Sequence, residues 1–188
     1  MKDIIRITHA LEFAARKHVK QRRKGKRKDP YVNHVAEVAR MLAEATAGKD
    51  TNLVIAGLLH DTIEDTKTKH RELARHFGQD VADLVQEVTD DKRLGKATRK
   101  RLQIENAPHK TRRAKMIKIA DKTANLHSVY ASPPPDWKLK RRREYLVWAC
   151  KVVSGCRGAN RVLEDGFDKA ARRLGKSLRL RREDYGSA

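Results

Sequence analysis

The sequence has few of the residues that mark disulfide-rich or redox proteins, and it has no segment suited to a membrane. It contains only two cysteines among 188 residues, and the spacing of Cys150 and Cys156 matches neither a zinc site nor a redox motif. No apolar run is long enough to cross a bilayer. The N-terminal stretch MKDIIRITHALEF carries charges among its apolar residues, unlike a signal peptide. We therefore expect a cytoplasmic protein with no membrane partner.

Strand-forming patterns are also missing, which excludes a substantial sheet. Aromatic residues make up only 5% of the chain, and no segment alternates apolar and polar residues with a period of two. Apolar residues instead recur at helical spacing. The sequence predicts an all-α single domain, a bundle of about eight to ten helices, over residues 1–175, followed by a basic and mobile tail over residues 176–188. The expected helices cover residues 4–19, 31–48, 52–65, 70–78, 80–90, 111–130, 136–155 and 158–175, with one more before Pro108.

Negative charge is scarce relative to positive charge. The chain has 44 Lys and Arg residues against 24 Asp and Glu, a net charge of +20. Such a balance predicts an anionic partner, whether nucleic acid, an anionic membrane surface or a phosphorylated small molecule. The basic residues are spread over most helices and the tail, with no recognised binding motif and few aromatic residues among them. The charge alone nevertheless suggests one alternative, a non-enzymatic nucleic-acid-binding protein. Weak non-specific nucleic-acid binding through the basic surface is also expected.

The stretch LLHDTIEDTKT places four ionisable residues directly after the apolar run LVIAGLL. Burying one such group without a partner costs several kcal/mol, and a metal ion is one way to compensate. On a helix, adjacent side chains point about 100° apart, yet His60 and Asp61 can both reach one ion at the helix flank. Glu64 and Asp65 lie one turn further on, where carboxylates could handle water.

Two further ionisable residues interrupt apolar helix faces elsewhere in the chain. His34 lies beside the Val35 and Val38 face of the second helix, and Asp121 interrupts the apolar face of AKMIKIADKTANL. Taken alone, His34 would be a satisfied core histidine and Asp121 a cap or half of an ion pair. As a set with His60 and Asp61, on three helices, they predict a shared metal. An iron site with two histidines and one carboxylate is a rival, disfavoured because such sites usually sit in β-barrels.

The pattern NH…LLHDTIEDT…KIADK resembles the HD superfamily of metal-dependent phosphohydrolases. More narrowly, the chain is similar to the small alarmone hydrolases, the stand-alone hydrolase members of the RelA/SpoT homologue family, in their metazoan type. The similar segments run from about residue 13 to residue 149 and include FAARKH, RRKG, PYVNH, FGQDVADLVQEVTDDK, RKRLQIENAP and EYLVWA. The resemblance implies an HD-domain bundle that hydrolyses the 3′-pyrophosphate of ppGpp and pppGpp, giving GDP or GTP and pyrophosphate.

The resemblance also implies roles for individual residues. The metal, Mn²⁺ with one ion per chain, would be held by His34, His60, Asp61 and Asp121. Two imidazoles and two carboxylates suit Mn²⁺ better than an all-oxygen magnesium site. Glu64 and Asp65 would handle water. The expected nucleotide contacts are Arg23, Lys24, Lys96, Asn125 and Tyr145.

The chain also departs from the family pattern at some positions, and the resemblance leaves one alternative activity open. Trp148, which follows Tyr145 by three residues, is expected in the core instead of at the nucleotide. Val35 follows the first histidine where the family usually has proline, and His127 stands where it often has arginine. Another phosphohydrolase activity on the same scaffold, NADPH 2′-phosphatase or nucleotidase, is a further alternative, because these enzymes share the metal ligands.

Overall fold

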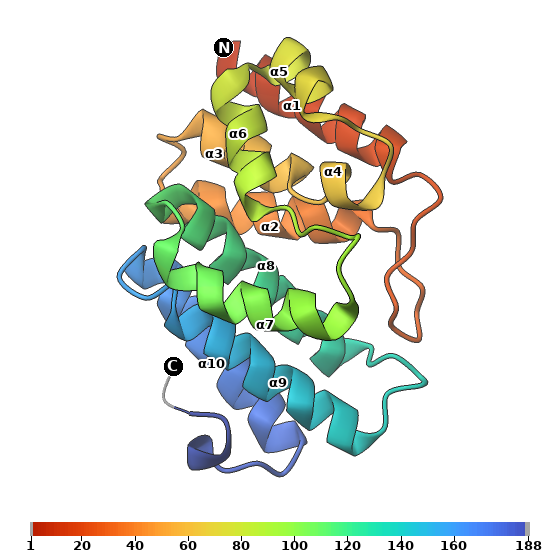
Figure 1. The fold of residues 1–188 in the computed structure, drawn as a ribbon, viewed down its shortest axis with the longest axis vertical. Coiled ribbons are helices and arrows are strands. Elements are labelled where there is room, and N and C mark those ends of the chain that lie inside the picture. The colour runs from red at the N-terminus through yellow and green to blue at the C-terminus, as the bar shows by residue number, and fades with distance from the viewer. Residues whose placement is uncertain (1, 187–188) are drawn as a thin grey trace.

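The computed structural model describes residues 2–186 and shows an all-α protein (Figure 1). Within that range the only β-type pairing is a single bridge between Arg22 and Pro30. The α-helices are α1 (Lys2–Lys17), α2 (Val32–Ala45), α3 (Thr51–Leu59), α4 (Thr62–Asp65), α5 (His70–Phe77), α6 (Gln79–Val88), α7 (Lys96–Asn106), α8 (Arg112–Ala131), α9 (Leu139–Ser154) and α10 (Arg161–Ser177). Two short 3-10 helices, η1 (Ala107–His109) and η2 (Arg182–Asp184), complete the described chain. The predicted fold class is confirmed.

Helix α8 runs through the middle of the molecule and is buried on nearly all sides (Figure 1). The Thr111 side chain accepts a hydrogen bond from the Ala114 amide and caps its N-terminus. The helix packs against α2, α3, α6, α9 and α10. Because every face of α8 meets another helix, three of its charged residues, Lys118, Asp121 and Lys122, are buried as well. These charges must find partners inside the protein.

Helix α3 is buried as its apolar sequence predicts, but the expected continuous helix over residues 52–65 is wrong in one respect. The chain leaves α3 after Leu59 and begins α4 at Thr62. Asp61 has φ −99° and ψ −1°, and the Thr62 hydroxyl donates to the Leu59 carbonyl at 2.6 Å. This local hydrogen bond competes with the helical ladder. The break turns two adjacent side chains toward one point, so that His60 Nε2 lies 3.0 Å from Asp61 Oδ2.

Helices α2 and α3 approach each other closely at Gly57. A methyl group at position 57 would lie 2.5 Å from Leu42 Cδ1, so the buried Leu42 side chain would have to shift, and it would touch Ala39 Cα at 3.4 Å. The Gly57 carbonyl also lies 2.8 Å from His60 Nδ1. The close packing of the two helices therefore sets the distance between His34 on α2 and His60 at the end of α3.

Helix α7 lies across the surface of the bundle and has no fully buried side chain (Figure 1). It is attached mainly by polar contacts. The Trp148 indole nitrogen donates to the Lys100 carbonyl at 3.0 Å, Gln103 donates to Asp90, and Arg99 lies 3.8 Å from Glu64. Helix α7 thus forms one wall of the space between α4, α8 and α9.

The residues after α10 fold back onto the last two helices. The Leu178 carbonyl accepts hydrogen bonds from Arg143, and Tyr185 is 9% exposed with its ring beside Gly175. The division into a domain of residues 1–175 and a mobile tail of residues 176–188 stays a prediction, and Ser187 and Ala188 lie outside the described residues. None of the helices in the described range has the length and apolar character that crossing a bilayer needs.

We predict that Gly57→Ala lowers the free energy of unfolding by about 1–3 kcal/mol, the usual cost of overpacking a core. The added methyl group would lie 2.5 Å from Leu42 Cδ1, and this fully buried side chain has to shift within the core to make room. Thermal unfolding followed by circular dichroism measures the effect, at about 2–4 °C per kcal/mol for a chain of this size.

The matched control is Gly166→Ala in the middle of α10. No atom lies within 4 Å of a methyl group at that position, and alanine stabilises a helix interior by about 0.5–1 kcal/mol relative to glycine. The two substitutions should therefore shift the melting temperature in opposite directions. A Gly57→Ala variant as stable as the wild type would show that α2 and α3 are not locked at this distance.

Candidate active site

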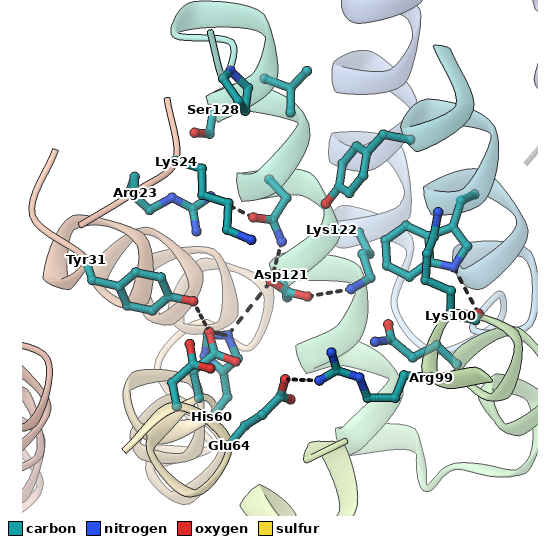
Figure 2. Close-up of a pocket in the computed structure, with 18 of the residues that line it drawn as sticks. Arg23, Lys24, Tyr31, His60, Glu64, Arg99, Lys100, Asp121, Lys122 and Ser128 are labelled. Carbon is teal, nitrogen blue, oxygen red and sulfur yellow. Dashed lines mark hydrogen bonds and ion pairs between the residues drawn. The ribbon is translucent and has the colours of Figure 1, made fainter. Parts of the chain in front are cut away.

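A cavity of about 410 Å³ opens between α4, α7, α8, α9 and the loop that precedes α2 (Figure 2). Positive side chains dominate its lining. The acidic residues are Asp61, Glu64, Asp65 and Asp121, and the basic residues are Arg22, Arg23, Lys24, Lys92, Lys96, Arg99, Lys100, Lys118, Lys122 and Arg141. Such a lining favours an anionic ligand.

Three side chains of types that can hold a metal ion meet beside this cavity, and His60 and Asp121 line it. One ligand atom from each of His34, His60 and Asp121 lies within 4.8 Å of the other two. The Asp121 Oδ1 atom is 3.3 Å from His34 Nε2 and 3.9 Å from His60 Nε2. Asp61 adds a second carboxylate, because its Oδ2 is 3.0 Å from His60 Nε2 and 3.7 Å from His34 Nε2.

The two imidazole nitrogens that face these carboxylates have no hydrogen-bond partner among the described residues. Both histidines are buried, at 3% and 5% exposure for His34 and His60. Buried polar atoms are nearly always paired, so two unpaired nitrogens beside two carboxylates indicate a ligand. This donor set, two nitrogens and two carboxylates, fits a divalent transition metal ion.

Neighbouring groups fix the orientation of the proposed ligands. The Gly57 carbonyl can only accept, so His60 Nδ1 donates to it and leaves Nε2 free to face the cluster. Tyr31 donates to Asp61 Oδ2 at 2.5 Å. Asn125 donates to Asp121 Oδ1 at 2.6 Å, and Lys122 donates to Asp121 Oδ2 at 2.9 Å. Figure 2 shows Tyr31 and Lys122 approaching the cluster from opposite sides.

The electrostatics of the cluster favour a positive charge between the carboxylates. Burial acts to raise the pKa of Asp121, but the Lys122 ammonium and the two histidines hold it well below its usual value. Burial likewise acts to raise the pKa of Asp61, but His60 and His34 together hold it well below its usual value. Burial acts to lower the pKa of His60, yet Asp61 and Asp121 raise it to about 9. Either a proton or a metal ion at these nitrogens would supply the positive charge that the two carboxylates favour.

The two carboxylates expected to handle water have different surroundings. Glu64 Oε2 accepts a hydrogen bond from the Asp90 amide at 3.2 Å, and Glu64 Oε1 lies 3.8 Å from Arg99. Burial, with the charges of Asp61 and Asp90, raises the pKa of Glu64. Asp65 instead accepts from Gln21 at 2.7 Å and forms an ion pair with Lys92. The surroundings of Glu64 therefore favour its protonated form, whereas Asp65 is held in place by Gln21 and Lys92.

The structure brings the sequence-predicted residues together. Arg23, Lys24, Lys96, Asn125 and Tyr145 line the same cavity as His60, Asp61, Glu64, Asp65 and Asp121, and His34 lies directly behind the cluster. Arg23 donates to Asn125 at 2.6 Å, which links the loop to α8. The Tyr145 ring lies 5.2 Å from the Trp137 ring, and burial raises its pKa to about 12.

Sequence reasoning missed several residues of the cavity wall. Tyr31 and Lys122 each bond a carboxylate of the cluster, and Lys122 carried a usable signal, since it is a charged residue within an apolar helix. Lys100 and Arg141 looked like ordinary solvated charges. Trp148 was expected in the core, but it lines the cavity and joins α9 to α7.

Comparison with known proteins shows the family of the chain. A family model described as HD domain matches residues 10–150. The chain is 49% identical over 166 residues to guanosine-3′,5′-bis(diphosphate) 3′-pyrophosphohydrolase MESH1 of Xenopus tropicalis, covering 88% of this chain and 93% of that one. It is 45% identical over 176 residues to the MESH1 of Homo sapiens, covering 94% and 98% of the two chains.

Solved structures give the same result. A structure described as a metazoan ortholog of SpoT that hydrolyzes ppGpp matches with a TM-score of 0.86 and 46% identity, covering 90% of this chain and 96% of that one. The protein lmo0812 of Listeria monocytogenes matches with a TM-score of 0.63 and 33% identity, covering 78% and 99% of the two chains. The resemblance in the sequence motifs is thereby confirmed, and the chain belongs to the HD domain family, among the stand-alone guanosine-3′,5′-bis(diphosphate) 3′-pyrophosphohydrolases of the MESH1 type.

Proposed function

We propose that this protein hydrolyses the 3′-pyrophosphate of the alarmones ppGpp and pppGpp, giving GDP or GTP and pyrophosphate. The observation that carries the proposal is the pair of unpaired histidine nitrogens facing Asp61 and Asp121 at the wall of a cationic cavity. A metal-dependent phosphohydrolase needs a metal site next to a site that binds the anionic phosphate, and this arrangement provides both. The identity of 45–49% to the MESH1 enzymes over most of the chain supports the substrate.

The metal in this proposal is Mn²⁺, with one ion per chain held by His34, His60, Asp61 and Asp121. The mixed nitrogen and oxygen donor set supports this choice over Mg²⁺, which prefers oxygen ligands. When bound, such an ion lowers the pKa of a coordinated water and polarises a phosphoryl oxygen. Tyr31, Asn125 and Lys122 orient the two carboxylates by the hydrogen bonds already described.

In the proposed reaction Glu64 is the general base. It accepts a proton from the water that adds to the phosphorus bonded to O3′. The bond between that phosphorus and O3′ breaks, and O3′ takes up a proton to become the ribose hydroxyl. The raised pKa of Glu64 suits this role, because a general base is most efficient when its pKa lies near the pH at which the enzyme works. Asp65, tied to Gln21 and Lys92, positions the water.

The nucleotide contacts in this proposal come from three elements around the cavity. Arg23 and Lys24 of the loop before α2 and Lys96 of α7 hold phosphates, and charge-assisted hydrogen bonds suit them to that task. Asn125 of α8 lies between Arg23 and Asp121, so it links nucleotide binding to the metal ligands. Tyr145 packs on the nucleoside, as an aromatic ring can.

Three further features belong to the same proposal. Residues 1–175 form the catalytic domain, and the protein acts in the cytoplasm. The net charge of +20 gives weak, non-specific binding to nucleic acid at low salt, because release of counterions drives such binding. In this proposal nucleic acid binds the basic surface in competition with other anions, and the enzyme does not hydrolyse it.

A substrate panel tests the proposed activity. Purified protein loaded with Mn²⁺ is incubated with ppGpp, pppGpp, NADPH and deoxynucleoside triphosphates, and the products are identified by chromatography. Release of pyrophosphate from both alarmones is expected. Turnover confined to NADPH or to the deoxynucleotides would instead assign one of the other phosphohydrolase activities that share this ligand set.

We predict that His60→Ala and Asp121→Ala each abolish stoichiometric metal binding and turnover while the helical content persists. The helices around the cluster are already packed by apolar side chains, so the metal is not needed for the fold. Bound metal is measured by elemental analysis and helix content by circular dichroism. His109→Ala, a change at an exposed histidine in η1, is the matched control and should retain both properties. Full activity of either cluster variant would remove the metal site from the mechanism.

We predict that Glu64→Gln lowers kcat roughly 10²–10⁴-fold, the usual contribution of a general base. Metal content and KM should stay close to the wild-type values, because Glu64 is placed outside the ligand set. Steady-state kinetics with ppGpp and metal analysis make the distinction. The control is Glu105→Gln, which removes an exposed carboxylate from α7. Loss of metal in Glu64→Gln, in parallel with loss of rate, would make Glu64 a ligand.

A further inference from the structure

Helix α1 is followed by a buried histidine that stands outside the metal cluster. His18 comes directly after Lys17, the last residue of α1, and it is 2% exposed. Its Nδ1 lies 2.6 Å from Gln21 Oε1, whereas its Nε2 is buried with no hydrogen-bond partner among the described residues. An apolar side chain could fill the same space without leaving a nitrogen unpaired. The bond to Gln21 is therefore the polar contact that a histidine adds at this position.

The Gln21 side chain connects this histidine to one of the two water-handling carboxylates. Its Nε2 donates to Asp65 Oδ2 at 2.7 Å, and Asp65 Oδ1 forms an ion pair with Lys92. An ionised carboxylate can only accept hydrogen bonds, so Gln21 must present its NH2 group to Asp65. The carbonyl oxygen of the same amide then faces His18.

The carboxylate thus sets the direction of both hydrogen bonds. Because Gln21 Oε1 is an acceptor, His18 Nδ1 must carry a proton and donate it. Burial lowers the pKa of His18, although the bond to Gln21 and the charges of Asp61 and Asp65 act to raise it, so the ring is neutral at neutral pH. His18 therefore stays in the tautomer with its proton on Nδ1. As a fixed donor it holds the Gln21 amide in one of its two possible orientations.

The backbone of the loop before α2 keeps the members of this chain together. The Gln21 amide donates to the His18 carbonyl at 2.8 Å, and the Gln21 carbonyl accepts from the Tyr31 amide at 3.1 Å. The His18 and Tyr31 rings pack with their centres 4.9 Å apart. The Tyr31 hydroxyl donates to Asp61, and Figure 2 shows it directed at the cluster. The buried His18 ring thus lies at the base of a turn whose two sides reach Asp65 and Asp61.

We propose that His18 is a positioning residue for the hydrolytic water, because it orients Gln21, and Gln21 holds the Asp65 carboxylate toward that water. This inference rests on the proposed function for the role of Asp65, whereas the hydrogen-bonded chain itself does not depend on that role. Without the His18 donor, the Gln21 amide can rotate and present its carbonyl oxygen to Asp65. Two acceptors then face each other, and the carboxylate turns away. His18 does not line the cavity, so its loss should slow turnover without weakening nucleotide binding.

A matched pair of substitutions tests the donor at position 18. His18→Asn places an amide NH2 group close to where Nδ1 stands, and His18→Leu fills a similar space with no donor. His18→Leu should lower kcat for ppGpp about three- to tenfold, the loss expected from one neutral hydrogen bond, and leave KM within about twofold of wild type. His18→Asn should restore most of kcat. Equal losses of kcat in the two variants would overturn the inference.

A double variant shows whether His18 acts through Gln21. The variant with both His18→Leu and Gln21→Met should have the same kcat as Gln21→Met alone, because the second change has already removed the bond to Asp65. Losses that multiply would overturn the chain. If His18→Leu does not fold, His18→Asn and Gln21→Met carry the comparison, since the first should keep kcat and the second should lose it.

The split between kcat and KM separates positioning from a general disturbance of the loop. Arg23 and Lys24, which hold phosphates in the proposed function, follow Gln21 in the same loop, so a disturbed loop would raise KM. A rise in KM with unchanged kcat would therefore overturn the inference. The control is His70→Leu, which removes a histidine bond of 2.7 Å to Asp83 outside the cavity and should leave both constants unchanged.

Nuclear magnetic resonance of the Gln21 amide tests the chain without turnover. The protein has four glutamines, and the side-chain amide signals that disappear in Gln21→Met are those of Gln21. Zn²⁺, which is not paramagnetic, takes the place of Mn²⁺ in this measurement. The bond to Asp65 should shift these signals downfield in wild type and His18→Asn, and His18→Leu should return them to the position of a free amide. If wild type hydrolyses neither alarmone but the signals depend on His18, the proposed function fails and the chain stands. Signals unchanged in His18→Leu would overturn the inference whatever the activity.

Discussion

Two buried histidine nitrogens that face two carboxylates require a positive charge between them, and the packing of the surrounding helices holds these four side chains together. The four side chains come from α2, the end of α3 and α8, so a single cation would join three helices. Their separation depends on the close contact of α2 with Gly57 and on the break after Leu59. The hydrogen bonds from Tyr31, Asn125 and Lys122 then hold the carboxylates in place. Burial of these four ionisable side chains would be costly without a proton or a metal ion between them.

The basic side chains of the cavity fall into two groups, which differ in whether a carboxylate neutralises them. Lys122 and Lys92 pair with Asp121 and Asp65, whereas Lys96 and Lys100 on α7 line the cavity without an acidic partner among the described residues. A highly charged anion that enters the cavity is therefore attracted most strongly to α7, away from the cluster of histidines and carboxylates. This attraction is long-ranged only at low ionic strength, because at physiological salt the screening length is about 8 Å. Close contacts, and not the net charge of the chain, set the affinity inside the cavity.

Helical periodicity was enough to predict the all-α fold, because apolar faces recur along almost every segment. The proximity of the candidate metal ligands was predictable for a related reason, since His34 and Asp121 occupy positions where the pattern requires apolar side chains. The break at His60 and Asp61 was not predictable, because it depends on one hydrogen bond from the Thr62 hydroxyl. Lys100 and Arg141 were missed because a charged residue on a polar helix is most simply explained by solvent. Only the packing of α7 against α9 turns them toward a cavity.

The lack of buried side chains in α7 has a consequence for how the cavity opens. A helix docked by polar contacts separates from its protein at a lower free energy than one docked by apolar side chains, and its amide hydrogens exchange sooner. The wall that carries Lys96 and Lys100 is thus among the least stable parts of an otherwise well-packed bundle. A polyanion bound in the cavity would contact this wall together with α8 and α9, so its binding would stabilise the docked position of α7.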